Sequence, residues 1–133
     1  MSKTPGVGIA LLIRHQQRIL IGCRNKAPMQ GSWQLPGGWL RYGETATHTI
    51  DRLSAGFPGM RLTHPAFVAV TDNHFADGFH SISLYYRSGC LNGDEIDLQL
   101  NPSCSDWYWA DWYDLPDSLF LPLAELRDSG FVP

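Results

Sequence analysis

The strongest constraint on the fold is a pair of glycines between a predicted strand and a predicted helix. Residues 33–35 predict a short strand, which Pro36, Gly37 and Gly38 are expected to end. Residues 45–55 contain neither Pro nor Gly and predict a helix. Two adjacent glycines can adopt positive φ and let the backbone approach a ligand. Such a unit suits a diphosphate and its cation, and a plain tight turn is the simpler alternative.

The remaining pattern predicts a mixed sheet packed between helices. A polar loop is expected at 72–79, and a final helix within 119–128 should carry Pro122 in its first turn and Gly130 as its C-cap. Five further segments have the length and apolar content of strands: 7–13, 18–23, 66–71, 81–87 and 107–110.

Length and composition predict one globular domain spanning residues 1–133, with 44% hydrophobic and 17% charged residues. The net charge is −3 and no basic block is present, which argues against binding to a nucleic-acid polymer. Three widely spaced cysteines indicate neither a disulfide framework nor a zinc site. Because the sequence has no long apolar run, we expect a cytoplasmic protein without a membrane segment.

The segment from Gly38 to Met60 resembles the box of the Nudix hydrolases, G-x5-E-x7-R-E-U-x-E-E-x-G-U, in which U is aliphatic. The residues that fall on its spacing are Gly38, Glu44, Arg52, Gly59 and Met60. Other segments resemble successive elements of small MutT-like Nudix proteins: 5–8, 20–24, 31–38 and 107–112. The resemblance implies an α/β/α sandwich with a mixed sheet. It also implies hydrolysis of a nucleoside diphosphate linked to another group, assisted by Mg²⁺ or Mn²⁺, and a possible homodimer.

The box lacks the residues that hold the metal in the family. Leu53, Gly56 and Phe57 stand where the resemblance places glutamates, and none of these side chains can bind a cation. Mg²⁺ or Mn²⁺ is therefore expected to bind weakly or not at all. Ala46, Ile50, Leu53 and Phe57 recur at 4-3-4 spacing, which predicts that this helix face packs in the core.

Two residues of the box are candidates for catalysis, Glu44 and Arg52. Glu44 is also the one candidate metal ligand that the box retains. The alternative interpretation is an ion pair between Glu44 and Arg52 that holds the loop against the helix. His48 and Asp51 could form a substitute site, or they are the solvated side of the helix.

The candidate substrate-binding residues are Arg24, Gly37, Gly38 and Trp39. Arg24 resembles the arginine that touches substrate phosphate in some Nudix relatives, and a surface charge is the alternative. Trp39, beside the glycines, is the best candidate to stack on a base. The other aromatic residues are expected mostly to fill the core: Trp33, Tyr42, Trp107, Trp109 and Trp112.

A polar cluster in the predicted loop contains Asp72, His74, Asp77 and His80. Imidazoles and carboxylates together can bind a metal or act as a general base, and a solvated loop is the alternative.

One branch of the family, the GDP-mannose mannosyl hydrolases, is similar at Arg52, Leu53 and Ser54. Those enzymes cleave at the sugar carbon with one metal and a histidine base. Phe57 replaces the glutamate that this branch keeps, and no histidine stands near Cys104, where its base would fall.

Two functional hypotheses follow. The first is a Nudix hydrolase that acts on a nucleoside diphosphate linked to another group, with altered or weakened metal use. The second is a nucleotide-binding module without turnover. Both have a small-molecule nucleotide as partner.

Overall fold

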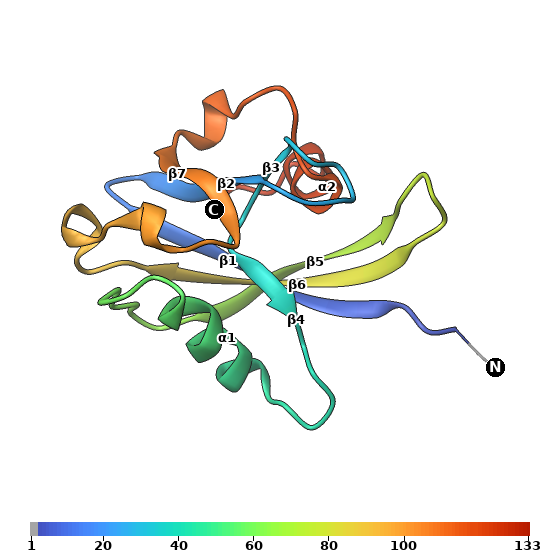
Figure 1. Ribbon diagram of the computed structural model, residues 1–133, viewed down its shortest axis with the longest axis horizontal. Helices are drawn as coiled ribbons and strands as arrows, with labels where there is room; N and C mark the ends of the chain where they lie inside the picture. Colours follow the sequence, from blue (N-terminus) through green and yellow to red (C-terminus); the bar gives the residue numbers. More distant parts are fainter. Residues whose placement is uncertain (1–2) are drawn as a thin grey trace.

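In the computed structural model, which describes residues 3–133, a mixed sheet lies between two α-helices (Figure 1). Residues 1 and 2 of the predicted domain lie outside the described part. The strands are β1 Gly6–His15, β2 Arg18–Arg24, β3 Trp33–Gln34, β4 Gly37–Trp39, β5 Ala66–His74, β6 His80–Gly89 and β7 Cys104–Ala110. The helices are α1 Ala46–Ala55 and α2 Leu121–Asp128. Neither α-helix of the described part is long and apolar enough to cross a lipid bilayer.

Strand β1 is the centre of the sheet, whose main path runs β3-β2-β1-β6-β5. It pairs with β6 in parallel from Gly6 to Arg14, and with β4 antiparallel from Gly8 to Ala10. The contact of β1 with β2 is confined to the hairpin end, and β2 then pairs with β3 and β7. The sheet therefore splits beside β1.

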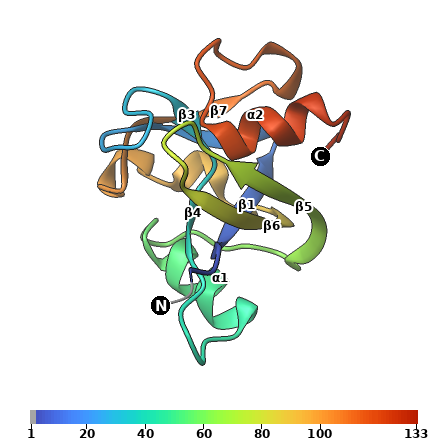
Figure 2. The same cartoon turned by 90° about the vertical axis from the view of Figure 1, so that its right-hand side faces the viewer.

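Side chains of β1 alternate between two cores, one on each face of the sheet. Ile9, Leu11 and Ile13 pack in the core that contains α1, whereas Leu12 packs with Tyr85 in the core that contains α2. Turning the molecule by 90° shows the sheet between the two helices (Figure 2). Because both faces of the sheet are covered, the central strand is apolar from Val7 to Ile13 instead of alternating with polar residues. The predicted α/β/α architecture is confirmed.

The first helix begins at its cap, where the Thr45 hydroxyl accepts a bond from the His48 amide at 3.1 Å. Its predicted apolar face packs in the core, since Ile50 and Phe57 are buried and Ala46 and Leu53 lie against them. That prediction is confirmed.

The two glycines do not form the expected turn. Gly37 and Gly38 extend as β4, opposite Ala10 and Ile9, and neither has positive φ. A Cβ on Gly37 would lie 2.9 Å from the Ile9 carbonyl oxygen, and one on Gly38 would lie 3.0 Å from Leu53 Cδ2. Close approach to neighbouring groups, and not a left-handed backbone, therefore explains the glycines.

Several element boundaries also differ from the prediction, and three of these differences matter for the site or for the helix end. Strand β5 continues to His74, which shortens the expected polar loop to the turn at 75–79. Strand β7 begins at Cys104, before the predicted 107–110 segment. Helix α2 carries Pro122 in its first turn as predicted, but Ser129 is its cap and Gly130, at φ +87°, follows.

We predict that Gly22→Ala destabilises the fold. A Cβ at Gly22 would lie 2.5 Å from the buried Trp107 ring and 2.8 Å from the Cys104 Cβ. Overpacking of this kind costs about 1–3 kcal/mol. Urea denaturation followed by circular dichroism measures the change in the free energy of unfolding.

The matched control for this change is Gly8→Ala, because a Cβ at Gly8 meets no atom closer than 3.8 Å. We expect that variant to stay within about 0.5 kcal/mol of the wild type. Equal stability of the two variants would contradict the assigned role of Gly22.

Candidate functional site

A cleft of about 360 Å³ opens on the sheet face that carries α2. Its floor includes Gly8 and Ala10 of β1 and Ser81 and Ser83 of β6, and β4 forms one side. The cleft volume falls in the range of sites for small molecules. It also brings together the four predicted substrate-binding residues, Arg24, Gly37, Gly38 and Trp39.

Arg24 is held rigidly in the wall of the cleft. Its Nε donates to the Pro28 carbonyl at 2.8 Å, its Nη2 to the Ala27 carbonyl at 3.2 Å, and its Nη1 to Gln34 Oε1 at 2.6 Å. The guanidinium also stacks on the Phe120 ring, 4.0 Å from its centroid. Arg24 is only 9% exposed, so the interpretation as a surface charge is wrong. These bonds use three of its five N–H groups, which leaves two for a ligand.

Aromatic rings form a continuous wall from β4 to α2. The Trp39 ring, 52% exposed, meets Phe79 edge-on at 5.8 Å between centroids. Phe79 lies 5.7 Å from Phe75, and Phe75 lies 5.6 Å from Phe120. An exposed indole beside a rigid aromatic wall is suited to stacking on a flat ligand group.

The floor of the cleft is polar. Asn73 is completely buried, and its Nδ2 donates to Ser81 Oγ at 3.0 Å and to Ser83 Oγ at 2.9 Å. Because each serine oxygen accepts from Asn73, each hydroxyl hydrogen can be donated elsewhere. The floor therefore offers hydrogen-bond donors to a ligand.

Glu44 and Arg52 do not line the cleft but pair with each other on the other side of β4. Arg52 Nη2 lies 2.9 Å from Glu44 Oε1 and also donates to the Trp39 carbonyl at 3.0 Å. Glu44 Oε1 further accepts from the Thr49 hydroxyl and the Arg41 amide, and Oε2 accepts from Arg52 Nε. Hydrogen bonds from Arg52, then from Thr49 and Arg41, lower the pKa of Glu44 to about 2.

The donors around Glu44 leave little room for a cation. A carboxylate has about four acceptor sites, and Glu44 receives four hydrogen bonds, two of them from Arg52. Three of these bonds end on Oε1 and one, from Arg52 Nε, ends on Oε2, so a metal at Glu44 would have to bind Oε2 beside a guanidinium.

The positions of the family's metal-binding glutamates lie in packed surroundings. Phe57 is 1% exposed and meets the Trp107 ring edge-on at 4.9 Å. Leu53 packs against Gly38, and a Cβ on Gly56 would lie 2.9 Å from Asn101 Nδ2. Mg²⁺ and Mn²⁺ need oxygen ligands, so this set of residues does not fit either ion.

The exposed candidates on α1 and in the aromatic set lie apart from the cleft. His48 and Asp51 are exposed on α1 and do not line it. Trp107 and Trp112 are buried as predicted, whereas Tyr42 is fully exposed and is not part of the core.

Sequence reasoning missed the residues that complete the cleft: Phe75, Phe79, Phe120, Ser81 and Ser83. Phe75 and Phe79 flank the tip of the β5–β6 hairpin, where the Phe75 amide donates to the Phe79 carbonyl at 2.9 Å. Two aromatic residues four apart around a polar turn were the available signal. Their contact with Phe120 depends on the tertiary fold and has no local signal.

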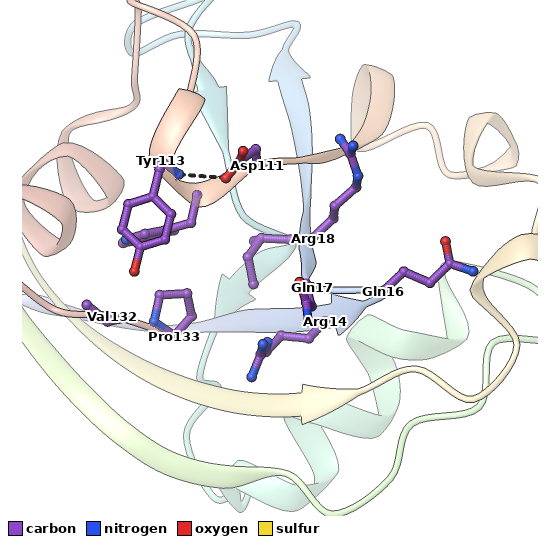
Figure 3. Close-up of a pocket in the computed structure, with 10 residues that line it drawn as sticks. Arg14, Gln16, Gln17, Arg18, Asp111, Tyr113, Val132 and Pro133 are labelled. Carbon is purple, nitrogen blue, oxygen red and sulfur yellow. Dashed lines mark hydrogen bonds between the residues drawn. The ribbon is translucent and has the colours of Figure 1, made fainter.

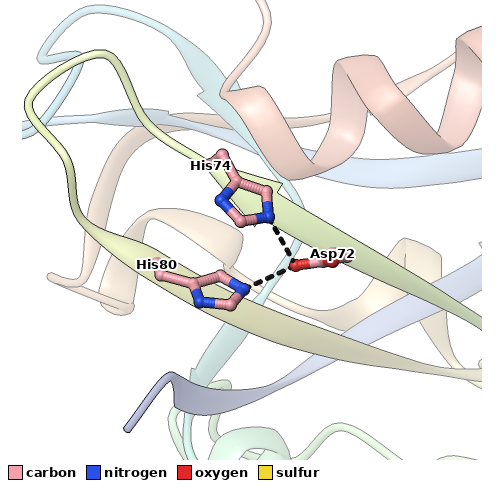
Figure 4. A group of neighbouring side chains, drawn as sticks. All are labelled: Asp72, His74 and His80. Atoms are coloured by element: carbon pink, nitrogen blue, oxygen red, sulfur yellow. Dashed lines mark hydrogen bonds and ion pairs between the residues drawn. The ribbon is translucent and has the colours of Figure 1, made fainter. Parts of the chain in front are cut away.

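The predicted polar cluster forms in part. Asp72 Oδ1 lies 3.1 Å from His74 Nε2 and 2.6 Å from His80 Nε2 (Figure 4). Asp77 is not part of the group, because its carboxylate accepts from the Phe79 amide. The three residues stand on strands and not in the expected loop.

A second hollow, of about 490 Å³, lies at the hairpin end of β1 and β2 (Figure 3). Its lining includes Arg14, Arg18 and Tyr113. None of the predicted site residues borders it, and we assign it no function.

Comparison with known proteins gives the family. The profile of the NUDIX domain matches residues 2–132. The low-salt glycan biosynthesis protein Agl8 of Haloferax volcanii is 32% identical over 77 residues, which cover 58% of this chain and 49% of Agl8. The match thus spans about half the length of that relative.

Solved structures agree on the fold. A MutT NUDIX hydrolase from Burkholderia pseudomallei superposes with a TM-score of 0.79 at 24% identity, covering 95% of this chain and 98% of that one. The NUDIX domain of Shewanella oneidensis NrtR, solved in complex with ADP ribose, gives a TM-score of 0.72 at 22% identity, covering 97% and 88%. At these identities the likeness shows the fold alone. With the profile match over almost the whole chain, it follows that this protein is a member of the Nudix family.

Proposed function

We propose that the cleft binds a nucleoside diphosphate linked to a second group, and that Mg²⁺-dependent hydrolysis of this ligand is very weak. The observation that carries the proposal is the meeting of a buried arginine, an exposed indole and a polar floor in one cleft. The complex of the NrtR domain with ADP ribose supports this class of ligand.

The cleft supplies complementary groups for each part of such a ligand. Arg24 and Lys26 line it and provide the positive charge that a diphosphate requires. Trp39 presents a ring on which a base can stack, and Ser81 and Ser83 offer hydroxyl donors. The net charge of −3 over the whole chain does not oppose this, because the charged residues that line the cleft are cationic.

Weak hydrolysis follows from the surroundings of α1. In phosphoryl transfer, metal ions neutralise the developing charge and position the nucleophile. Leu53 and Phe57 pack as core residues, and Glu44 accepts hydrogen bonds from Arg52, Thr49 and Arg41. On this proposal Glu44 and Arg52 chiefly position β4, through the bond to the Trp39 carbonyl. Residual turnover would depend on Glu44, the remaining carboxylate of the box.

The second candidate function is nucleotide binding without turnover. It is favoured by the contact of Phe57 with Trp107, which shows that one ligand position of the family serves the core here. A hydrolysis assay separates the two candidates.

We predict that Trp39→Ala weakens binding of ADP-ribose by about 1–3 kcal/mol, the usual contribution of a stacked base. Isothermal titration calorimetry measures the change in Kd. Tyr42→Ala is the matched control, because Tyr42 is fully exposed and does not border the cleft. Equal losses in both variants would rule out stacking on Trp39.

We predict that the wild type hydrolyses nucleoside triphosphates, ADP-ribose and nucleotide sugars very slowly with Mg²⁺ or Mn²⁺. Loss of one electrostatic group at an active site costs about 10²–10³ in rate, and three are absent here. Rates are measured beside those of a Nudix hydrolase whose helix carries all the glutamates. Comparable rates would overturn the proposal of weak hydrolysis. Residual turnover that disappears in Glu44→Gln would assign catalysis to Glu44, and binding without turnover would favour the silent module.

We predict that Glu44→Gln removes a contribution to stability that depends on pH. The pKa of Glu44 falls from 4.5 to about 2 on folding, so its contribution is complete above pH 4.5 and is lost as the pH falls toward 2. The variant should be less stable than the wild type at pH 7, and the two should converge near pH 2. Urea denaturation across this range tests the prediction, with the exposed Glu95→Gln as control. A difference that does not change with pH would refute it.

A further inference from the structure

Three side chains with metal-binding atoms converge at the base of the β5–β6 turn. The Oδ1 atom of Asp72 and the Nε2 atoms of His74 and His80 all lie within 4.8 Å of one another (Figure 4). His74 and His80 are 68% and 37% exposed, so an ion from solvent can reach them. The group is separate from α1 and its box.

The strand register holds these side chains together. Asp72 and His74 are two residues apart on β5 and therefore share one face, and His80 is the cross-strand partner of His74. The two imidazole rings stack, with centroids 4.1 Å apart and planes inclined by 20°. Both rings turn an Nε2 atom toward the same carboxylate oxygen. The backbone thus fixes the spacing of the three groups.

The spacing is close to that of ligands around a tetrahedral ion. Bonds of about 2.0–2.2 Å place neighbouring ligand atoms about 3.3 Å apart. Asp72 Oδ1 lies 3.1 Å from His74 Nε2 and 2.6 Å from His80 Nε2. The exposed side chains of Asp72 and His80 can move apart by less than about 1 Å, which would bring the shorter of these two distances to the tetrahedral spacing.

We propose that Asp72, His74 and His80 form a binding site for one divalent transition-metal ion of the Zn²⁺ class. Two imidazoles and one carboxylate suit Zn²⁺, Ni²⁺ or Cu²⁺, whereas Mg²⁺ prefers oxygen ligands only. The site is therefore selective against the ions that the Nudix box holds in its relatives. Water completes the coordination on the exposed side.

The site would fix the wall of the nucleotide cleft. His74 and His80 immediately flank the turn that carries Phe75 and Phe79, and these two rings line the cleft. Because side chains alternate along a strand, Asp72 and His74 lie on the face opposite Asn73, the residue that donates to the cleft-floor serines. An ion that bridges β5 and β6 would restrict the turn from behind without entering the cleft.

Titration of the full chain with Zn²⁺ alone, in the absence of nucleotide, tests the proposal by calorimetry. We expect one ion per chain, an affinity at least about tenfold lower in the double variant His74→Gln and His80→Gln, and a rise in the Tm of the wild type on adding Zn²⁺ that this double variant does not show. The matched control is His48→Gln with His64→Gln, which removes two exposed histidines elsewhere. Binding that persists unchanged in the first variant, or is lost in the second, would overturn the proposal.

Two further measurements keep the test specific. Cys23→Ser must retain the site, since Cys23 is partly exposed and thiolates bind zinc; loss of binding in that variant would contradict the assignment. Co²⁺ in place of Zn²⁺ should give the visible absorption of a tetrahedral nitrogen and oxygen site. If Co²⁺ gave the wild type neither this absorption nor a change in Tm, the proposed site would also be contradicted. Because the proposed ligands are exposed, we expect the metal-free variants to keep the wild-type Tm.

Discussion

Strand β1 pairs with other strands along both edges and packs in a core on both faces, and these interactions position the rest of the sheet and the cleft. Its parallel pairing with β6 places Ser81 and Ser83 in the cleft floor, and its antiparallel pairing with β4 brings Trp39 over Gly6 and Gly8. Its side chains supply one core on each side. Burying an aliphatic residue of this kind contributes about 1.5–3 kcal/mol. The cleft is thus built on a strand that is paired along both edges and packed on both faces.

Leu53 and Phe57, which stand where the resemblance places metal-binding glutamates, belong to the packing of the interior. Leu53 fills the space over Gly38, and the Phe57 ring closes the core against Trp107. A glutamate at Phe57 would bury a charge without a partner and remove a well-packed ring, each of which is costly. Restoring the box by point substitutions would therefore require repacking this core.

Features with a local periodic signal could be predicted from the sequence, and features made by long-range pairing could not. The apolar stripe from Ala46 to Phe57 follows the helical period, and it packs as that period indicates. The resemblance pointed to Arg24, and its place beside the glycines pointed to Trp39; both residues line the cleft. Gly37 and Gly38 were misjudged because their environment is set by Ile9 and Leu53, far away in the sequence.

The same limit explains the residues that were missed. Phe75 and Phe120 are 45 positions apart and meet only through the packing of the folded chain. The pairing of His74 with His80 depends on the strand register, which a polar and glycine-containing turn does not define by itself. Catalytic and metal-binding roles are harder still to predict from sequence, because they require interatomic distances to be correct to within a few tenths of an ångström.

The confinement of Arg24 has a thermodynamic consequence. Its charge is almost removed from water and is only partly compensated by two carbonyls, an amide oxygen and an aromatic ring. Withdrawing a permanent cation from solvent in this way is unfavourable until an anion completes its solvation shell. The uncompensated part of this desolvation lowers the free energy of unfolding of the protein. An anionic ligand that bound Arg24 in the folded protein alone would therefore raise the free energy of unfolding.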